Sequence, residues 1–285
     1  MSIRMFVADL DGTLLNDKGE VSRGALAAIE RLRSRGVEFI PATGRSLPEC
    51  VHVMKAIGHE GRMIAAGGAL VHECRRGDVL LRRPIAADLV KRLVEVVSRH
   101  GHLAHLLQDH TATTHDYLMI GEQEFDPATK WWFDTLPLTY RRIEKLTDMD
   151  AMHHTVRVGT VALGDELGAV AQDVEATLGG LVTAQHWPAL TAEKAIQTRT
   201  HLLETFAARV SKWTSVAALA ALDGVHREEI AAIGDGLNDF ELIREAGLGM
   251  AMGNADPRIA AVARVQVATN SAEGFAESVE RALAS

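Results

Sequence analysis

Two stretches of the sequence each place a pair of carboxylates directly after a short apolar run. Asp9 and Asp11 lie two residues apart in the first stretch, so in an extended chain both side chains project to the same side. Asp235 and Asp239 lie on a glycine-containing loop in the second. Carboxylates at the end of a buried strand are costly unless they are paired or bind a metal, and Mg²⁺ is typically held by one or two carboxylates, phosphate and water. Both stretches indicate a site for a hard cation, although each alone also fits an ordinary turn, the second with Asp239 as a helix N-cap.

Groups suited to a phosphate lie beside and between these acidic stretches. Thr13 and Thr43 offer hydroxyl groups, and Gly44 begins a run of backbone N–H groups near a predicted helix start, where phosphate oxygens bind readily. Lys212 precedes another predicted helix and could neutralise both an acidic nucleophile and a phosphate. Taken singly, a Thr-Gly pair also marks an ordinary turn, and a lone lysine is usually just solvated.

Strands and helices must position these groups, and both ends of the chain alternate between the two. Strand-helix-strand spacing of this kind predicts parallel pairing with right-handed crossovers, and therefore a doubly wound, Rossmann-like α/β sheet. The polar clusters follow predicted strands, and in such sheets ligands bind at the carboxyl ends of the strands. The predicted strands are 3–10, 37–42, 63–66, 229–233, 248–252 and 265–268, and the predicted helices are 24–35, 47–57, 216–222, 240–246 and 275–283.

The middle of the chain differs, because histidines and tryptophans concentrate there. Its predicted strands are 102–107, 156–163 and 181–184, and its predicted helices are 87–98 and 167–178. We interpret this part as an α+β domain inserted into the sheet domain. The expected division is a discontinuous core of residues 1–83 and 205–285 and an insertion of residues 84–204.

Length and composition limit the remaining possibilities. A chain of 285 residues with 47% apolar residues fits a globular protein with two cores. Its formal net charge of -8 comes without a block of Lys and Arg, so no nucleic-acid or membrane partner is expected. Two cysteines, acidic residues by position 9 and the lack of any apolar stretch of ~18 residues lead us to expect a cytoplasmic protein. Nothing in the sequence indicates the oligomeric state.

Four motifs in this order resemble the haloacid dehalogenase superfamily of phosphotransferases, in its Cof-like branch with a large C2-type (IIB) cap. They are Asp-Leu-Asp-Gly-Thr at 9–13, Thr-Gly-Arg at 43–45, Ser-Lys at 211–212 and Gly-Asp-Gly-Leu-Asn-Asp at 234–239. The resemblance covers about residues 3–71 and 202–283. The middle segment matches by position and alternating pattern only. The resemblance implies a magnesium-dependent phosphoric monoester hydrolase with an aspartyl-phosphate intermediate.

The resemblance also implies a role for each matching residue. Asp9 would be the nucleophile and a metal ligand, and Asp11 the general acid and base, binding the metal through its backbone carbonyl. Asp235 would ligate Mg²⁺. The phosphate-binding positions would be Thr43, Gly44, Lys212 and Asn238, of which Asn238 contacts the phosphate or positions Lys212. The supporting positions would be Thr13, Arg45, Asp239 at the metal site, and Asn254, which lines the same pocket.

Three positions depart from the family pattern. Gly67 replaces an asparagine that usually follows the third strand, so a side-chain contact to the substrate or to the cap would be missing. Trp213 replaces a glycine after the lysine and would bring bulk to the pocket rim. Pro41 removes a ladder N–H within a predicted strand, which strand ends tolerate.

The expected substrate is a small phosphorylated metabolite, either a sugar phosphate or a phosphorylated cofactor, because a large cap excludes macromolecules. Two alternatives stay open. One is a phosphomutase of the same superfamily, and the other is a non-catalytic sugar-phosphate-binding protein. The complete set of acids at Asp9, Asp11, Asp235 and Asp239 argues against the second alternative.

Several conspicuous side chains of the insertion and core are given no primary role. His102 and His105 differ by three positions, so on one strand they would face opposite sides, and a metal site is not expected among the neighbouring histidines. A substrate contact from one of them stays open. Trp131, Trp132 and Phe133 fit the core or an interface of the insertion better than a roof over the pocket. Cys50 and Cys74 are interpreted as structural. The histidines concerned are His100, His102, His105, His110 and His115.

Overall fold

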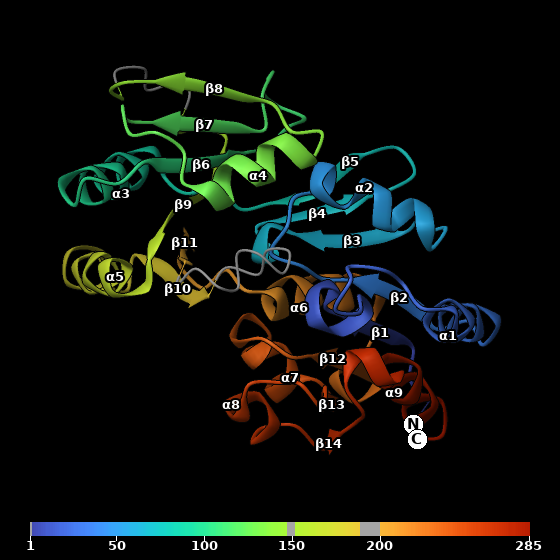
Figure 1. The fold of residues 1–285 in the computed structure, drawn as a ribbon. Coiled ribbons are helices and arrows are strands. Elements are labelled where there is room, and N and C mark those ends of the chain that lie inside the picture. The colour runs from blue at the N-terminus through green and yellow to red at the C-terminus, as the bar shows by residue number, and fades with distance from the viewer. Residues whose placement is uncertain (1, 147–151, 189–199) are drawn as a thin grey trace. The chain divides into compact units, whose positions relative to one another are not determined.

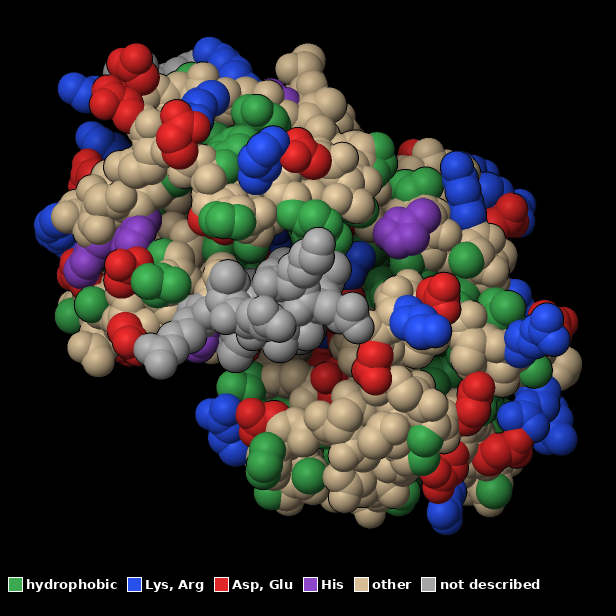
Figure 2. Space-filling model, in the orientation of Figure 1, with side chains coloured by type: hydrophobic (Ala, Val, Ile, Leu, Met, Phe, Trp, Pro, Cys, Tyr) green, Lys and Arg blue, Asp and Glu red, His purple; other side chains and the backbone are tan. Residues whose placement is uncertain are grey.

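The chain divides into two compact units in the computed structural model, which describes residues 2–146, 152–188 and 200–285 (Figure 1). The first unit comprises Met1–Leu81 and Ser211–Ser285, and the second comprises Arg82–Val210. The second unit is thus inserted between the two segments of the first. On the face drawn in Figure 2, basic and acidic side chains of the described residues intermingle rather than forming a large patch of one sign.

A five-stranded parallel sheet forms the centre of the first unit, in the order β14-β13-β12-β1-β2. The chain lays β2 on one side of β1 and β12 on the other, so the strand order reverses between β1 and β12. In an open parallel sheet this reversal leaves a crevice at the carboxyl ends of the two strands. The strands are β1 (Met5–Ala8), β2 (Glu38–Pro41), β12 (Ile230–Gly234), β13 (Leu248–Ala251) and β14 (Val265–Gln266).

Both faces of this sheet are covered, which explains why β1 reads as an unbroken apolar run. Val7 packs in one core cluster with Val216 of α6. On the opposite face, the ring of Phe6 lies 5.9 Å from that of Phe275 in α9, measured between centroids. The helices of this unit are α1 (Arg23–Ser34), α2 (Leu47–Ala56), α6 (Lys212–Asp223), α7 (Phe240–Glu245), α8 (Pro257–Ala260) and α9 (Gly274–Leu283).

The third predicted strand is present, but its main pairing is antiparallel rather than parallel as predicted. β3 (Arg62–Ala65) meets the residues directly after β2 in a parallel bridge between Ala42 and Ile64. It pairs antiparallel with β4 (Leu70–Glu73) in a small sheet of order β3-β4-β5, completed by β5 (Asp78–Arg82). The reason is local, because the turn after β3 returns the chain directly alongside it as a hairpin. The other expected strands of the core sheet are present.

A six-stranded sheet of order β10-β11-β9-β6-β7-β8 forms the second unit. Its pairs are antiparallel except β7 with β8. Two helices, α3 (Ala87–Arg99) and α5 (Gly164–Leu178), share an apolar core with the sheet. The strands are β6 (Ala104–Gln108), β7 (Tyr117–Ile120), β8 (Tyr140–Ile143), β9 (Thr155–Leu163), β10 (Val182–Pro188) and β11 (Thr200–Ala207).

The ends of the second unit differ from the expected joints. β11 lies wholly within this unit, so the expected boundary at 204/205 falls inside a strand, whereas the unit ends at Val210. The sequence analysis predicts no strand at the position of β11. This strand directly follows residues 189–199, which the structure does not describe. None of the helices in the described ranges is long and apolar enough to cross a membrane.

Candidate active site

The turn after β1 places the first acid pair at the crevice between β1 and β12. Asp9 is 5% exposed, and its N–H donates to the carbonyl of Ile233 on β12 at 3.1 Å. The chain then turns at Gly12, which has a φ of +73°. A Cβ at this position would lie 2.4 Å from Oδ2 of Asp235. Glycine is therefore required both by the left-handed backbone and by the close approach of the second loop.

The loop after β12 brings the second acid pair to the same place. Asp239 is fully buried, and its Oδ2 accepts the backbone N–H groups of Asp235 and Gly236, each at 3.1 Å. Asp235 accepts the hydroxyl of Thr13 at 2.8 Å. The two acidic stretches, which are more than two hundred residues apart, are thus joined by a direct side-chain contact.

Lys212 supplies the buried cation of the site. It is the first residue of α6, after the N-cap Ser211, and it has no solvent exposure. Its Nζ donates to Oδ1 of Asp9 at 2.5 Å and to Oδ1 of Asp239 at 2.7 Å. Burial alone would lower the pKa of Lys212, but the two carboxylates raise it above its ordinary value, so the side chain is charged.

Three carboxylates converge closely enough to share one cation. Oxygen atoms of Asp9, Asp235 and Asp239 all lie within 4.8 Å of one another. Burial, together with the charges of Asp239, Asp235 and Asp11, raises the pKa of Asp9 well above its usual value despite the opposing Lys212. Burial and Asp239 raise the pKa of Asp235 to about 7. One lysine therefore does not compensate the negative charge of the cluster, and an all-oxygen set of this kind fits a hard divalent cation.

The second predicted motif lies at the end of β2. Thr43 is buried, its N–H donates to the carbonyl of Ile64, and its Oγ1 accepts the N–H of Arg45 at 3.2 Å. The guanidinium of Arg45 binds both oxygens of Asp11, with Nε 2.8 Å from Oδ2 and Nη2 bonded to Oδ1. Gly44 lies between Thr43 and Arg45, in the turn that leads to α2. Neither residue type nor spacing predicts the Arg45–Asp11 pair, because the two residues are on different motifs.

Two asparagines take different positions around the cluster. Asn254 donates to the carbonyl of Gly12 at 2.8 Å and accepts the N–H of Asn270 at 2.9 Å, so it holds the turn after β1. Asn238 is half-buried on the loop between Asp235 and Asp239.

The departures at positions 67 and 213 have local explanations. Gly67 and Gly68 both have positive φ, and a Cβ on Gly68 would lie 2.1 Å from the carbonyl oxygen of Ser211. The glycine pair therefore lets the start of α6 approach the turn after β3, where Ser215 donates to the carbonyl of Gly68 at 2.7 Å. Trp213 is half-buried and packs against the apolar core of the first unit. Its indole thus adds to the core packing next to Lys212.

The residues of the second unit that received no primary role are dispersed. His100 lies 2.9 Å from a carboxylate oxygen of Asp173, whereas His105 is buried and its pKa is lowered to about 4, chiefly by burial. Phe133 belongs to an aromatic cluster on and beside α4 (Pro127–Thr135), and Trp131 and Trp132 lie on the same helix. The other rings of the cluster are Tyr117, Phe125 and Tyr140.

Both cysteines of the first unit have high thiol pKa values. Cys50 is fully buried in α2, and burial raises the pKa of its thiol well above the ordinary value. Burial likewise raises the pKa of Cys74 to about 11. Neither thiol is activated as a nucleophile.

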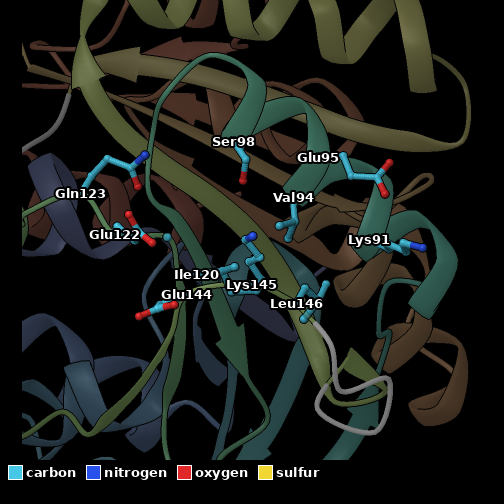
Figure 3. Close-up of a pocket in the computed structure, with 11 residues that line it drawn as sticks. Lys91, Val94, Glu95, Ser98, Ile120, Glu122, Gln123, Glu144, Lys145 and Leu146 are labelled. Carbon is cyan, nitrogen blue, oxygen red and sulfur yellow. The ribbon is translucent and has the colours of Figure 1, made fainter.

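The second unit also contains a cavity of about 400 Å³, drawn in Figure 3. Its side chains come from α3, from the end of β7 and from the loops that follow β7 and β8. Three glutamates and two lysines line it, so it has no excess of positive charge that would attract a phosphate. None of the predicted site residues is among its lining residues.

The model of the haloacid dehalogenase-like hydrolases matches residues 6–279 of this chain. The chain belongs to this family. A phosphatase relative from Escherichia coli, 5-amino-6-(5-phospho-D-ribitylamino)uracil phosphatase YbjI, is 24% identical over 99% of this chain and 97% of its own length. The predicted Cof-like family, the α/β fold class and the enzyme class of phosphoric monoester hydrolase are thereby confirmed.

Two further comparisons concern length and fold. Endoribonuclease YBEY, chloroplastic, from Arabidopsis thaliana is 27% identical over 96% of this chain, but the chain spans only 45% of that relative's length. Among solved structures, a haloacid dehalogenase-like hydrolase from Bacteroides thetaiotaomicron superposes with a TM-score of 0.78, at 24% identity, over 98% of this chain and 99% of its own. This likeness concerns the fold shared with other haloacid dehalogenase-like hydrolases.

Proposed function

We propose that this hydrolase removes phosphate from a small phosphorylated metabolite, a sugar phosphate or a phosphorylated cofactor, with Mg²⁺ and through an aspartyl-phosphate on Asp9. The convergence of Asp9, Lys212 and Asp235 at the reversal of the strand order is the observation that carries the proposal. The relative named for a phosphorylated ribityl compound supports the substrate class. We further propose that residues 82–210 act as a cap and the remaining two segments as the catalytic core.

Asp9 would attack the phosphorus, and the bond between phosphorus and the leaving oxygen would break. Asp11 would donate a proton to that oxygen, a contribution of typically about 10²–10⁴-fold. In the second step Asp11 would take a proton from water as the water attacks the phosphorus, which releases phosphate and restores Asp9. A carboxylate nucleophile thus divides one difficult displacement into two easier ones.

The negative charge on the transferring group would be balanced by Lys212, the hydroxyl of Thr43 and backbone N–H groups from Gly44 onward, with Asn238 as a further contact. The side chains of Asp9 and Asp235 and the backbone carbonyl of Asp11 would hold Mg²⁺, with Asp239 supporting them. The bound ion would supply positive charge that offsets the clustered carboxylates and the phosphate. Thr13 would link the turn after β1 to the loop after β12, and Asn254 would hold the turn after β1, through the contacts described above.

Hydrolysis of 4-nitrophenyl phosphate by the purified protein, with Mg²⁺, with EDTA and as Asp9→Asn, tests the proposal. We expect Mg²⁺-dependent turnover that EDTA and the near-isosteric Asn both abolish. Asp17→Asn is the matched control, because Asp17 is an exposed acid of the same unit that bonds to Asn270 and Ser271. A covalent phosphoprotein trapped by acid quench should be present in the wild type and absent from Asp9→Asn.

A panel of phosphorylated metabolites follows whatever the result with the aryl phosphate, since a cap can reject an artificial substrate. Activity toward a member of the panel would name the substrate. Silence across the whole panel, with folded protein and saturating Mg²⁺, would reject the hydrolase proposal in favour of a mutase or a binding protein.

A further inference from the structure

Asp11 is held by a two-point ion pair that the reaction scheme does not by itself require. Arg45 binds one oxygen through Nε at 2.8 Å and the other through Nη2. The two side chains are 19% and 26% exposed, so the pair is largely shielded from solvent. A bidentate guanidinium-carboxylate pair fixes the plane of the carboxylate as well as its position.

Arg45 is itself anchored on both sides of its backbone. Its N–H donates to Oγ1 of Thr43 at 3.2 Å, and its carbonyl accepts the N–H of Ala66 at 2.8 Å. The guanidinium of Arg45, with its two parallel N–H donors, therefore projects from a backbone that is fixed between the end of β2 and the turn after β3. A guanidinium held in this way restricts the orientation of the carboxylate that it binds. A lysine would offer only a single ammonium group that rotates freely.

The two cations of the site are divided between different acids. Lys212 bonds to Asp9 and Asp239, whereas Arg45 bonds to Asp11. Asp11 lies in a turn that includes a left-handed glycine at position 12, and its backbone φ and ψ are non-helical within that turn. Its carboxylate is held from outside this turn, by Arg45 through both oxygens.

We infer that Arg45 is a positioning residue that orients the carboxylate of Asp11 for proton transfer to the leaving oxygen. The inference rests on the proposed hydrolase function. In the transfer, the proton moves from the Asp11 carboxyl to the leaving oxygen as the bond to phosphorus breaks, and Arg45 itself neither gains nor loses a proton. Its contribution is geometric, since misplacing a reacting group by about 1 Å can cost 10²-fold.

This role predicts that the effect of removing Arg45 depends on the leaving group. Phenolate is a stronger base than 4-nitrophenolate, and 2,4-dinitrophenolate is weaker than both. The phenyl ester therefore needs the proton most, although the three phosphates share one reacting group. A residue that binds phosphate or only stabilises the fold would instead affect all three alike.

The experiment measures kcat and KM for phenyl, 4-nitrophenyl and 2,4-dinitrophenyl phosphate with wild type, Arg45→Gln and Arg45→Lys. We expect Arg45→Gln to lower kcat/KM, which reports formation of the aspartyl-phosphate, by about 10²-fold for phenyl phosphate and by less than about 3-fold for the dinitrophenyl ester. Arg45→Lys should fall between, because it keeps the charge without the fork. Asp11→Asn should show the same leaving-group pattern, and the double variant should be little worse than either single variant.

Arg62→Gln is the matched control. Arg62 also forms a two-point pair, with Nε 2.7 Å from Oε1 of Glu38 and Nη2 bonded to Oε2, and it has the same 19% exposure. It lies on β3 away from the acid cluster, so its loss should lower the unfolding temperature without changing the ratio of the three rates.

Three results would overturn the inference. Equal losses of kcat/KM across the series would make Arg45 a phosphate ligand or a structural residue. Faster hydrolysis of phenyl phosphate by Arg45→Gln would mean that the ion pair with Arg45 hinders proton donation by Asp11. A folded wild type that turns over neither these esters nor the metabolite panel would instead reject the hydrolase function on which the inference rests.

Discussion

The ammonium nitrogen of Lys212 lies 2.5 Å from Oδ1 of Asp9, although 203 residues separate the two in the chain. Both side chains are buried, so neither charge is compensated by water. Breaking such a pair by removing one partner is strongly destabilising, because the other charge is left in a low-dielectric site.

Lys212→Met should therefore damage both activity and stability. We expect a loss of kcat of about 10²-fold or more and a loss of roughly 3 kcal/mol in the free energy of unfolding without metal. Urea titration and steady-state rates measure the two effects. Lys130→Met is the control, because the Lys130–Asp134 pair is exposed and should contribute little. An unaffected free energy of unfolding in Lys212→Met would contradict the importance of the buried pair.

Divalent cations should stabilise the folded protein in a pH-dependent way. Magnesium at about 100 times its dissociation constant should add about 2.7 kcal/mol to the free energy of unfolding. Because the pKa of Asp235 is raised to about 7, the ion must compete with a proton below that pH, and its affinity should fall as the pH drops through 7. Thermal unfolding with and without Mg²⁺ at pH 8 and pH 6 measures the effect.

The variant Asp235→Asn separates this site from nonspecific ion binding. It should lose most of the Mg²⁺-dependent rise in unfolding temperature, whereas Asp17→Asn should keep it. The same rise in both variants would place the ion elsewhere.

Two glycines allow backbone strain to be distinguished from a steric clash. Gly12 and Gly19 both have a φ of +73°, but a Cβ on Gly19 meets no atom within 4 Å, whereas one on Gly12 would lie 2.4 Å from Asp235. Either alanine substitution should cost about 1 kcal/mol of backbone energy. Only Gly12→Ala should also abolish turnover and Mg²⁺ binding, because it displaces Asp235. Equal activity in the two variants, measured on folded protein, would contradict this reading of the turn.

Stability of the second unit should fall as the pH is lowered from about 6.5 to 4. Burial lowers the pKa of His105 to about 4 against the opposing charge of Asp126, and Arg157 adds a smaller lowering effect. The unfolded chain therefore binds a proton at this residue first, so the free energy of unfolding is highest above pH 6.5 and declines toward pH 4. The total effect is at most about 3 kcal/mol.

His105→Gln removes this titration, so the difference between wild type and variant isolates it. Urea titrations at pH 7.5 and pH 5 should show a smaller pH effect in the variant. An identical pH effect in both proteins would mean that His105 does not titrate differently on folding.

The parallel core was predictable because its strands are buried on both faces and therefore read as short apolar runs. The residues that follow β1, β2 and β12 were predictable for the same reason, since the carboxyl ends of parallel strands meet at one edge of the sheet. The pairing of β3 was predicted wrongly, because an apolar run indicates that a strand is buried but does not specify the strand with which it pairs. The hairpin after it depends on the positive φ of Gly67 and Gly68.

The sequence did not allow us to predict which side chains of the site bind one another. The bond from Thr13 to Asp235 and the fork from Arg45 to Asp11 each join separate motifs, and neither spacing nor residue type specifies the partner. In the second unit, β7 and β8 were not predicted. β8 reads Tyr-Arg-Arg-Ile and is mostly exposed, so it shows neither an apolar run nor an alternation of apolar and polar residues.

The central position of β1 between β2 and β12 has a consequence for translation. β2 leaves the ribosome soon after β1, but β12 follows only when the entire second unit has been synthesised. At about 5–20 residues per second, the 225 residues from Met5 to its β12 partner Ile230 take roughly 11–45 s to make. During that interval one edge of β1 has no native neighbour, so a nascent chain stalled within residues 82–210 would be prone to aggregation.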